Sequence, residues 1–189
     1  MQNEFRILAV QAKPVSLNAS REGFAEEVRA TLANNAGTQM LAYPELHLFH
    51  APAESDDDRV AEIRACAISM DNPLISQLSQ IARSNGIWFI PGSIVEQGPG
   101  KHIYNTALVF NPDGEIVAKY RKMFPWRPFE PYTPGTEFAV FDVPSVGRFG
   151  VSICYDAWYP EVSRQLAWFG ADAVLTVNDA YAALLAIAA

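Results

Sequence analysis

The sequence has 189 residues, of which 50% are hydrophobic and 19% are charged, and this composition is typical of one globular domain with a sizeable core. Its 21 acidic side chains outnumber the 14 Lys and Arg side chains, so the formal net charge is -7. An acidic chain repels phosphate groups, which argues against nucleic acids and anionic membrane surfaces as partners.

Local patterns disfavour two further classes of protein. No apolar run reaches the roughly 18 residues of a membrane span. The stretch MQNEFRILAVQA lacks the basic region and long apolar core of a secretory signal, so we expect a cytoplasmic protein. Cys66 and Cys154 form no CxxC pair, and in a reducing compartment both are expected to be free thiols.

The first half of the chain alternates predicted strands with predicted helices. Apolar runs predict strands at 5–12, 39–46 and 87–97, and helical spacing predicts helices at 21–37 and 72–86. The acidic run at 54–58 predicts the start of a solvated helix, because acidic side chains favour the positive end of the helix dipole.

Two predicted hairpins and a helix–strand pair make up the second half. Residues 102–122 predict a hairpin around the turn NPDGE, and residues 137–154 predict another that turns near 144–147. A helix at 159–171 and a strand at 172–178 follow, and the Ala-rich residues 179–189 favour a helix. This order predicts a single α/β domain over residues 1–189, with helices covering a sheet or sheets.

Cys154 lies in the stretch GVSICYDAWYP, where a predicted strand meets a predicted helix. A nucleophile on such a turn is exposed, and backbone N–H groups from Tyr155 onward can face a developing oxyanion. The alternative is a buried structural cysteine, which is a common fate of a free thiol. The local pattern leaves both interpretations open.

Two other stretches carry candidate partners for a nucleophilic thiol, which needs a base. Pro44 ends the predicted strand in AYPEL, and Glu45 comes directly after it, where a carboxylate can lie at the mouth of a sheet. The stretch KYRKMFPWRPFEPYTPG carries Lys122, Trp126 and Glu130, and its prolines exclude a regular helix. Such a stiff loop can line a small pocket, although in each stretch the charged side chains could instead be solvated.

Other common site patterns are missing from the sequence. His47, His50 and His102 lack an HExxH motif or a cysteine pair to complete a metal site, so loop or edge positions are the better interpretation. A Cys–His dyad gains no support from their spacing. No glycine-rich phosphate loop and no GxSxG turn occurs.

Taken together, the motifs YPEL, YRKMFPW and ICYDAWYPE resemble those of the nitrilase or carbon–nitrogen hydrolase superfamily, in the family's order. The resemblance spans essentially residues 5–178, and the loop after Lys122 is most similar to the aliphatic amidase and formamidase branch. It implies an α-β-β-α sandwich that pairs into homodimers or larger homo-oligomers through helices around the cysteine. It implies neither a metal nor an organic cofactor.

The resemblance also implies a role for each matching residue. Cys154 is the nucleophile, and Glu45 is the general base. Lys122 stabilises the oxyanion together with the N–H of Tyr155. Glu130 orients the substrate or Lys122, and Trp126 forms a wall of the substrate pocket.

The implied reaction is hydrolysis of a small amide to an acid and ammonia through a cysteine thioester. Tyr155 and Asp156 stand where true nitrilases of this family tend to have Trp-Glu, which favours amides over nitriles. N-carbamoyl amines are the second choice of substrate. The family's domain usually continues well past the cysteine motif, so we expect a sandwich that is incomplete at its C-terminal end. A truncated, catalytically silent remnant that acts only by association is therefore the alternative from another class.

Overall fold

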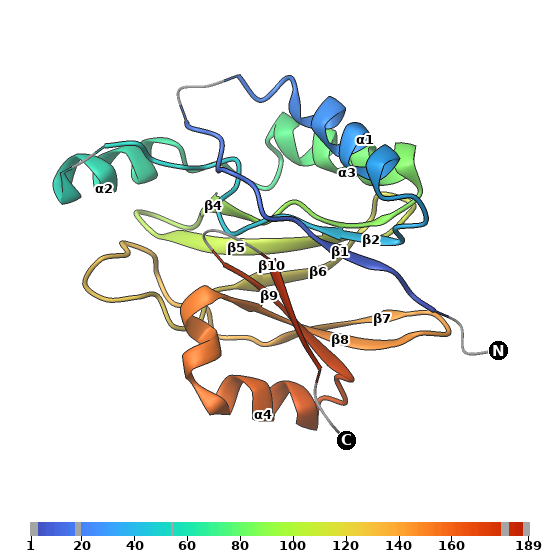
Figure 1. Cartoon of the computed structure of the whole chain (residues 1–189). Helices are drawn as coiled ribbons and strands as arrows, with labels where there is room; N and C mark the ends of the chain where they lie inside the picture. Colours follow the sequence, from blue (N-terminus) through green and yellow to red (C-terminus); the bar gives the residue numbers. More distant parts are fainter. Residues whose placement is uncertain (1–3, 18–19, 54, 179–181, 187–189) are drawn as a thin grey trace.

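The structure is a computed structural model that describes residues 4–17, 20–53, 55–178 and 182–186. Two β-sheets lie face to face, and helices cover the outer face of each (Figure 1). Helices α1 (Phe24–Asn34) and α3 (Pro73–Asn85) cover the first sheet, while α4 (Pro160–Trp168) covers the second. This arrangement confirms the predicted α-β-β-α sandwich.

The first sheet begins with three short parallel strands, β1 (Ile7–Ala9), β2 (Met40–Ala42) and β3 (Trp88–Ile90). The antiparallel strand β5 (Ile103–Phe110) follows, and it pairs along one edge with β3 and with β4 (Ser93–Gln97). Strand β6 (Ile116–Arg121) pairs with the other edge of β5 and completes the predicted hairpin. Helix α2 (Asp56–Ala65) begins in the acidic run, where the Ser55 side chain caps its N-terminus.

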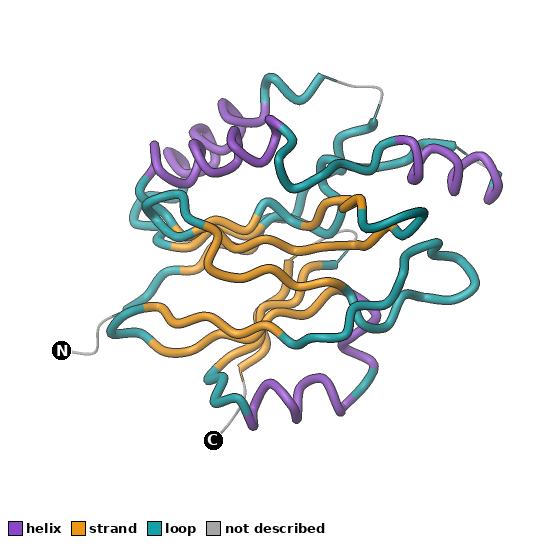
Figure 2. The backbone as a smooth tube through the Cα atoms, turned by 180° about the vertical axis from the view of Figure 1, so that it is seen from behind, coloured by secondary structure: helices purple, strands orange, loops and turns teal. Residues whose placement is uncertain are grey.

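The second sheet has the strand order β10-β9-β8-β7. Strands β7 (Ala139–Val143) and β8 (Gly147–Ile153) form the second predicted hairpin, and β8 pairs in parallel with β9 (Ala173–Val177). A short 3-10 helix, η1 (Cys154–Trp158), connects β8 to α4. Figure 2 shows the two sheets from behind, with α4 on the outer side of the second.

Two sequence predictions about secondary structure are wrong. The single strand expected at 87–97 is divided into β3 and β4, because the chain turns at Gly92, whose φ of 89° is unfavourable for residues with a Cβ. The helix expected at 179–189 is replaced over its described part by strand β10 (Ala182–Ala186), which pairs antiparallel with β9. The backbone hydrogen bonds of a sheet edge outweigh the helix propensity of alanine there.

The apolar core lies in three layers that follow the sandwich. One cluster fills the space between the first sheet and helices α1 and α3. The second lies between the two sheets and includes Ala107 and Tyr120 from the first sheet and Val151 and Leu175 from the second. A small third cluster packs α4 on the second sheet. Among the described ranges, no helix has both the length and the apolar character needed to cross a bilayer.

Candidate active site

Glu45 lies where the carboxyl ends of strands from both sheets meet. It follows β2 in the first sheet, and its backbone N–H donates to the carbonyl of Asn178, which directly follows β9 in the second sheet, at 2.8 Å. The Glu45 side chain is buried, with the residue only 1% exposed. The backbone therefore holds this carboxylate between the sheets, as the YPEL motif predicts.

Lys122 brings two carboxylates together at one ammonium group. Its Nζ is 2.9 Å from Oε1 of Glu45 and 2.8 Å from Oε1 of Glu130. The residue directly follows β6 and is fully buried, at 0% exposed. Its backbone is fixed on both sides, because its N–H donates to Asn105 O and its carbonyl accepts from the N–H of Gly135, each at 2.8 Å.

The two glutamates keep Lys122 charged in spite of its burial. Burial alone would lower the pKa of Lys122, but the charges of Glu45 and Glu130, the hydrogen bond with Glu130 and the neighbouring Cys154 raise it above the ordinary lysine value. An ammonium carries three N–H donors. Two of them are directed at the glutamates, which fixes the direction of the third.

Asn105 is a member of the site that the sequence analysis missed. Its Nδ2 donates to Oε1 of Glu45 at 2.7 Å, so this oxygen accepts from both Asn105 and Lys122. Asn105 is fully buried in β5, in the run IYNTALVF. A polar amide within an otherwise apolar strand was the available signal, since a buried amide needs hydrogen-bond partners.

Glu130 and Trp126 lie on the proline-rich loop after Lys122. The loop is closed by Glu130, whose Oε2 accepts from the backbone N–H of Trp126 at 2.8 Å while its Oε1 holds Lys122. Trp126 is 50% exposed, and its ring centroid lies 4.7 Å from that of Phe129 and 6.1 Å from that of Tyr155. These contacts bring Tyr155, which follows Cys154, next to the loop that carries Glu130.

Cys154 occupies the turn between β8 and η1, with a φ of 48°. This left-handed conformation is unfavourable for a residue with a side chain and occurs most often at functional sites. Its half-buried thiol lies near Lys122, whose pKa it helps to raise. Cys66, at the end of α2, differs: its Sγ donates to the carbonyl of Ile63 at 3.2 Å, and burial raises its pKa to about 11. Only Cys154 therefore combines a strained turn with a neighbouring cation.

A cavity of about 430 Å³ opens beside the glutamates. Glu45, His50, Arg59 and Glu130 contribute polar or charged groups, and Trp126, Phe129 and Tyr132 contribute aromatic walls. Polar groups that converge among apolar walls are typical of a small-molecule site. The cavity thus joins the residues predicted from two separate motifs, YPEL and the proline-rich loop.

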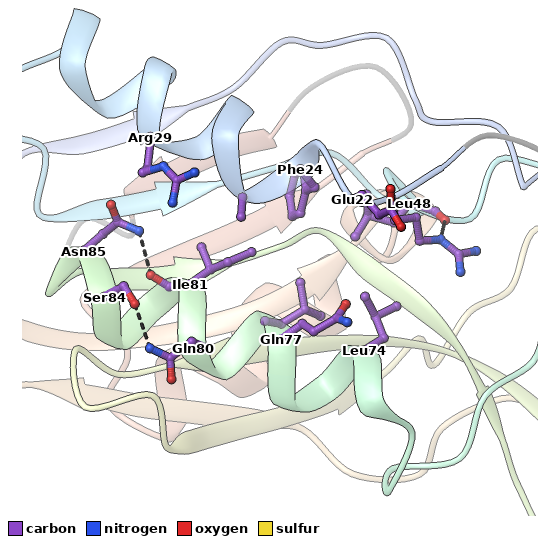
Figure 3. A pocket seen from close by; sticks show the side chains of 13 residues that line it. Glu22, Phe24, Arg29, Leu48, Leu74, Gln77, Gln80, Ile81, Ser84 and Asn85 are labelled. Carbon is purple, nitrogen blue, oxygen red and sulfur yellow. Dashed lines mark hydrogen bonds between the residues drawn. The ribbon is translucent and has the colours of Figure 1, made fainter.

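A second cavity, of about 480 Å³, lies between α1 and α3 (Figure 3). Phe24, Leu74 and Ile81 make it largely apolar, and Arg29, Gln80 and Asn85 lie toward its rim. Neither Glu45 nor Lys122 nor Cys154 lines it. Of these two cavities, the one of about 430 Å³ is therefore the candidate substrate site, because Glu45 and Glu130 line it.

His50 lines the cavity beside Glu45, whereas His47 and His102 have other partners. His47 lies in the turn after β2, but it is buried against the rings of Phe24 and Tyr43, and burial lowers its pKa to about 4. His102 Nδ1 is 3.0 Å from the hydroxyl of Thr133. Within the part of the chain that the structure describes, no three His, Cys, Asp or Glu side chains are grouped as metal ligands.

The chain is similar to curated amide hydrolases and to solved structures of the nitrilase superfamily. It is 30% identical over 182 residues to a formamidase from Nitratidesulfovibrio vulgaris, covering 93% of this chain and 54% of that protein. Nit3 of Saccharomyces cerevisiae, a member of branch 10 of the nitrilase superfamily, superposes with a TM-score of 0.75 at 26% identity over 92% of this chain and 64% of Nit3.

A third similar protein is known from a solved structure in complex with an amide. The mutant amidase from Nesterenkonia sp. AN1 in complex with butyramide superposes with a TM-score of 0.69 at 25% identity, over 92% of this chain and 65% of that chain. The present chain spans about half the length of the curated relatives that it matches. Residues 6–184 match the model of the carbon–nitrogen hydrolase family. The chain therefore belongs to the carbon–nitrogen hydrolase family.

Proposed function

We propose that this chain hydrolyses a small amide to a carboxylic acid and ammonia through a thioester on Cys154. Glu45 takes the thiol proton as the sulfur attacks the carbonyl carbon, and a C–S bond forms. Lys122 and the N–H of Tyr155 stabilise the oxyanion. The C–N bond then breaks as Glu45 passes its proton to the leaving nitrogen.

The second half of the reaction returns the enzyme to its starting state. Glu45 deprotonates a water molecule as its oxygen attacks the thioester. The C–S bond then breaks, the acid leaves, and Glu45 returns the proton to the sulfur to restore the thiol. One carboxylate can serve both halves of the reaction because it acts as a base and then as an acid in each. Glu130 acts through Lys122, whose ammonium it holds beside Glu45.

The observation that carries this proposal is the buried Glu45–Lys122–Glu130 cluster beside the strained turn of Cys154. A lysine with 0% exposure is costly unless charges compensate it. The arrangement therefore favours a functional use over a structural one. The names of the relatives, formamidase and amidase, support an amide as the substrate.

The experiment is ammonia release from formamide, acetamide, propionamide, an N-carbamoyl amine and a simple nitrile. The proposal predicts release from one or more amides by the unchanged chain and by C66A. Release is predicted to be undetectable for C154A, because the thiol is the nucleophile. The C66A variant is the matched control, since it removes the other cysteine.

Three outcomes would contradict the proposal. Full activity in C154A would exclude a thioester on this residue. Ammonia release from the N-carbamoyl amine alone would show that the substrate is a carbamoyl compound and not a simple amide. No release from any compound by a folded chain would favour the silent remnant.

A further inference from the structure

Asp156 is a buried carboxylate for which the proposed reaction has no use. It lies in η1, two residues after Cys154, and is 0% exposed. Its pKa is raised by burial, while hydrogen bonds from Ile153, Phe124 and Tyr120 act in the opposite direction. A buried carboxylate needs several donors to be tolerated, so its partners indicate what it does.

Three donors from two parts of the chain converge on Asp156. The backbone N–H of Ile153 donates to Oδ2 at 3.0 Å, and the hydroxyl of Tyr120 donates to the same oxygen at 2.8 Å. The backbone N–H of Phe124 donates to Oδ1 at 2.9 Å. Backbone N–H groups can only donate, so the arrangement fits the ionised carboxylate.

The positions of these donors relate the two halves of the catalytic site. Ile153 immediately precedes Cys154 at the end of β8 in the second sheet. Tyr120 and Phe124 lie two residues before and two residues after Lys122, in the first sheet and its following loop. A single carboxylate therefore joins the segment that carries the nucleophile to the segment that carries the lysine.

We propose that Asp156 is a positioning residue that holds the Cys154 turn in register with Lys122. This inference rests on the hydrolase function proposed above. Cys154 adopts a φ of 48°, which a residue with a side chain keeps only where its surroundings impose it. The bond from Ile153 to Asp156 spans this strained residue, and the bonds from Tyr120 and Phe124 fix its distance from the ammonium group.

The decisive variant is D156N, which keeps the shape of the side chain. An amide has one oxygen in place of two, so its NH₂ group must face the N–H of either Phe124 or Ile153. We predict that kcat falls about 100-fold with little change in KM, as expected for displaced reacting groups. Peptide mass spectrometry measures the rate at which iodoacetamide alkylates Cys154, with Cys66 in the same sample as the internal reference. We predict that the ratio of the Cys154 rate to the Cys66 rate is about 10-fold lower in D156N than in the unchanged chain.

The alkylation rate separates this proposal from the proposed function. It needs no amide turnover, so it reports the state of the Cys154 turn even if the unchanged chain releases no ammonia. It is measured below the melting temperature of each variant, where loss of stability alone would leave it unchanged. D142N is the matched control, because Asp142 is an exposed carboxylate paired with Arg148.

Y120F supplies a second variant that removes one donor and no charge. We predict slower alkylation of Cys154 by about threefold. Alkylation and kcat within twofold of the unchanged chain in D156N would overturn the proposal. If D156N does not fold, an unchanged alkylation rate in Y120F overturns it.

Discussion

Lys122 is the residue on which the geometry of the candidate site depends most. Its ammonium is the shared partner of Glu45 and Glu130, both within 2.9 Å. Burial removes these charges from water, so each one depends on the others for compensation. The same three residues therefore matter for stability and for the proposed reaction.

Replacing Lys122 by methionine tests both roles at once. K122M leaves the buried Glu45 without its cation, so we expect the free energy of unfolding to fall by about 3 kcal/mol. We also expect kcat/KM to fall by about 10³-fold, because oxyanion stabilisation is lost. Chemical denaturation and ammonia release measure the two effects.

Lys119 provides the matched control for this change. It pairs with Glu96 at 3.0 Å, but its side chain is 39% exposed and Arg121 binds the same carboxylate. Because Arg121 remains bound to Glu96, K119M leaves that carboxylate with a cation, and we expect a smaller loss of stability than in K122M. Equal losses of activity in K119M and K122M would contradict the role given to Lys122.

For single residues, the sequence motifs pointed to the charged side chains of the candidate site. They did not point to the buried residues that hydrogen-bond to the site or to its flanking backbone. Glu45 and Lys122 lie just past strands and Glu130 lies on the loop after Lys122, and the structure brings the three side chains together.

Asn105 and Asp156 could not be assigned in the same way. The Glu45 partner of Asn105 lies 60 residues away. Tyr120 and Phe124 lie 36 and 32 residues from Asp156. Only strand pairing within the first sheet and the packing of the two sheets bring these segments together.

Among the elements, the connection between β3 and β4 determines where Glu45 lies. Gly92 turns the chain with a φ of 89°, and a Cβ built there would be 1.8 Å from the carbonyl oxygen of Pro44. Pro44 directly precedes Glu45. The close approach of these two backbone segments therefore requires a glycine.

A G92A variant tests this requirement. It adds a steric clash to backbone strain, so we expect the free energy of unfolding to fall by about 3 kcal/mol and ammonia release to fall with it. G100A is the control, because Gly100 has a φ of 63° but nothing within 4 Å of a built Cβ. Strain alone predicts a loss of about 1 kcal/mol there, and equal losses in both variants would exclude the clash.

Strands β4, β5 and β6 share a buried ionic network around Glu96. Burial would raise the pKa of Glu96, but hydrogen bonds from Arg121, Thr106 and Lys119 outweigh it and lower the pKa from 4.5 to about 2. At a pH between these two pKa values, Glu96 is protonated in the unfolded chain and ionised in the folded chain. The contribution of Glu96 to the free energy of unfolding is therefore complete above about pH 5 and is lost as the pH falls toward about 2.

The pKa shift of Glu96 predicts how much the free energy of unfolding depends on pH. The shift corresponds to about 3 kcal/mol of unfolding free energy between neutral pH and about pH 2. Urea unfolding measures the free energy of unfolding at each pH. From neutral pH to about pH 2, this free energy should fall less in E96Q than in the unchanged chain. E161Q, which changes an exposed side chain of helix α4, should show the same fall in unfolding free energy as the unchanged chain. An unchanged decline in E96Q would remove Glu96 as its source.

The accuracy of the element predictions follows the strength of the local signals. The hairpin β5–β6 was predicted from the turn NPDGE, and α3 from its proline and its final glycine. The described part of 179–189 was predicted wrongly because its alanines favour a helix, whereas pairing with β9 makes it a strand. That pairing partner lies outside the segment, so local propensity could not reveal it.

For the molecule as a whole, the two sheets make the site only where they meet. Glu45 and Lys122 come from the first sheet and Cys154 from the second, while the bond from Glu45 to Asn178 and the carboxylate of Asp156 cross between them. Relative movement of the sheets would therefore separate the nucleophile from its base. The packing between the sheets is part of the proposed catalytic apparatus.

The outer face of η1 and α4 suggests that copies of the chain associate. Trp158 is 79% exposed and Trp168 is 74% exposed. Large exposed aromatic side chains are typical of protein interfaces. We expect a homodimer through this face, and W158E with W168E should shift the sedimentation coefficient at micromolar concentration to that of a monomer. V117E, on strand β6, should leave it unchanged, and a monomeric unchanged chain would contradict this expectation.

The most direct test of the account is partition of the acyl group to hydroxylamine during turnover of propionamide. A thioester on Cys154 transfers its acyl group to water or to hydroxylamine, so the account predicts propionhydroxamate beside propionic acid. Both products are predicted for the unchanged chain and for C66A, and neither for C154A. Ammonia release without hydroxamate, or hydroxamate that persists in C154A, would contradict the central claim that Cys154 carries the acyl group.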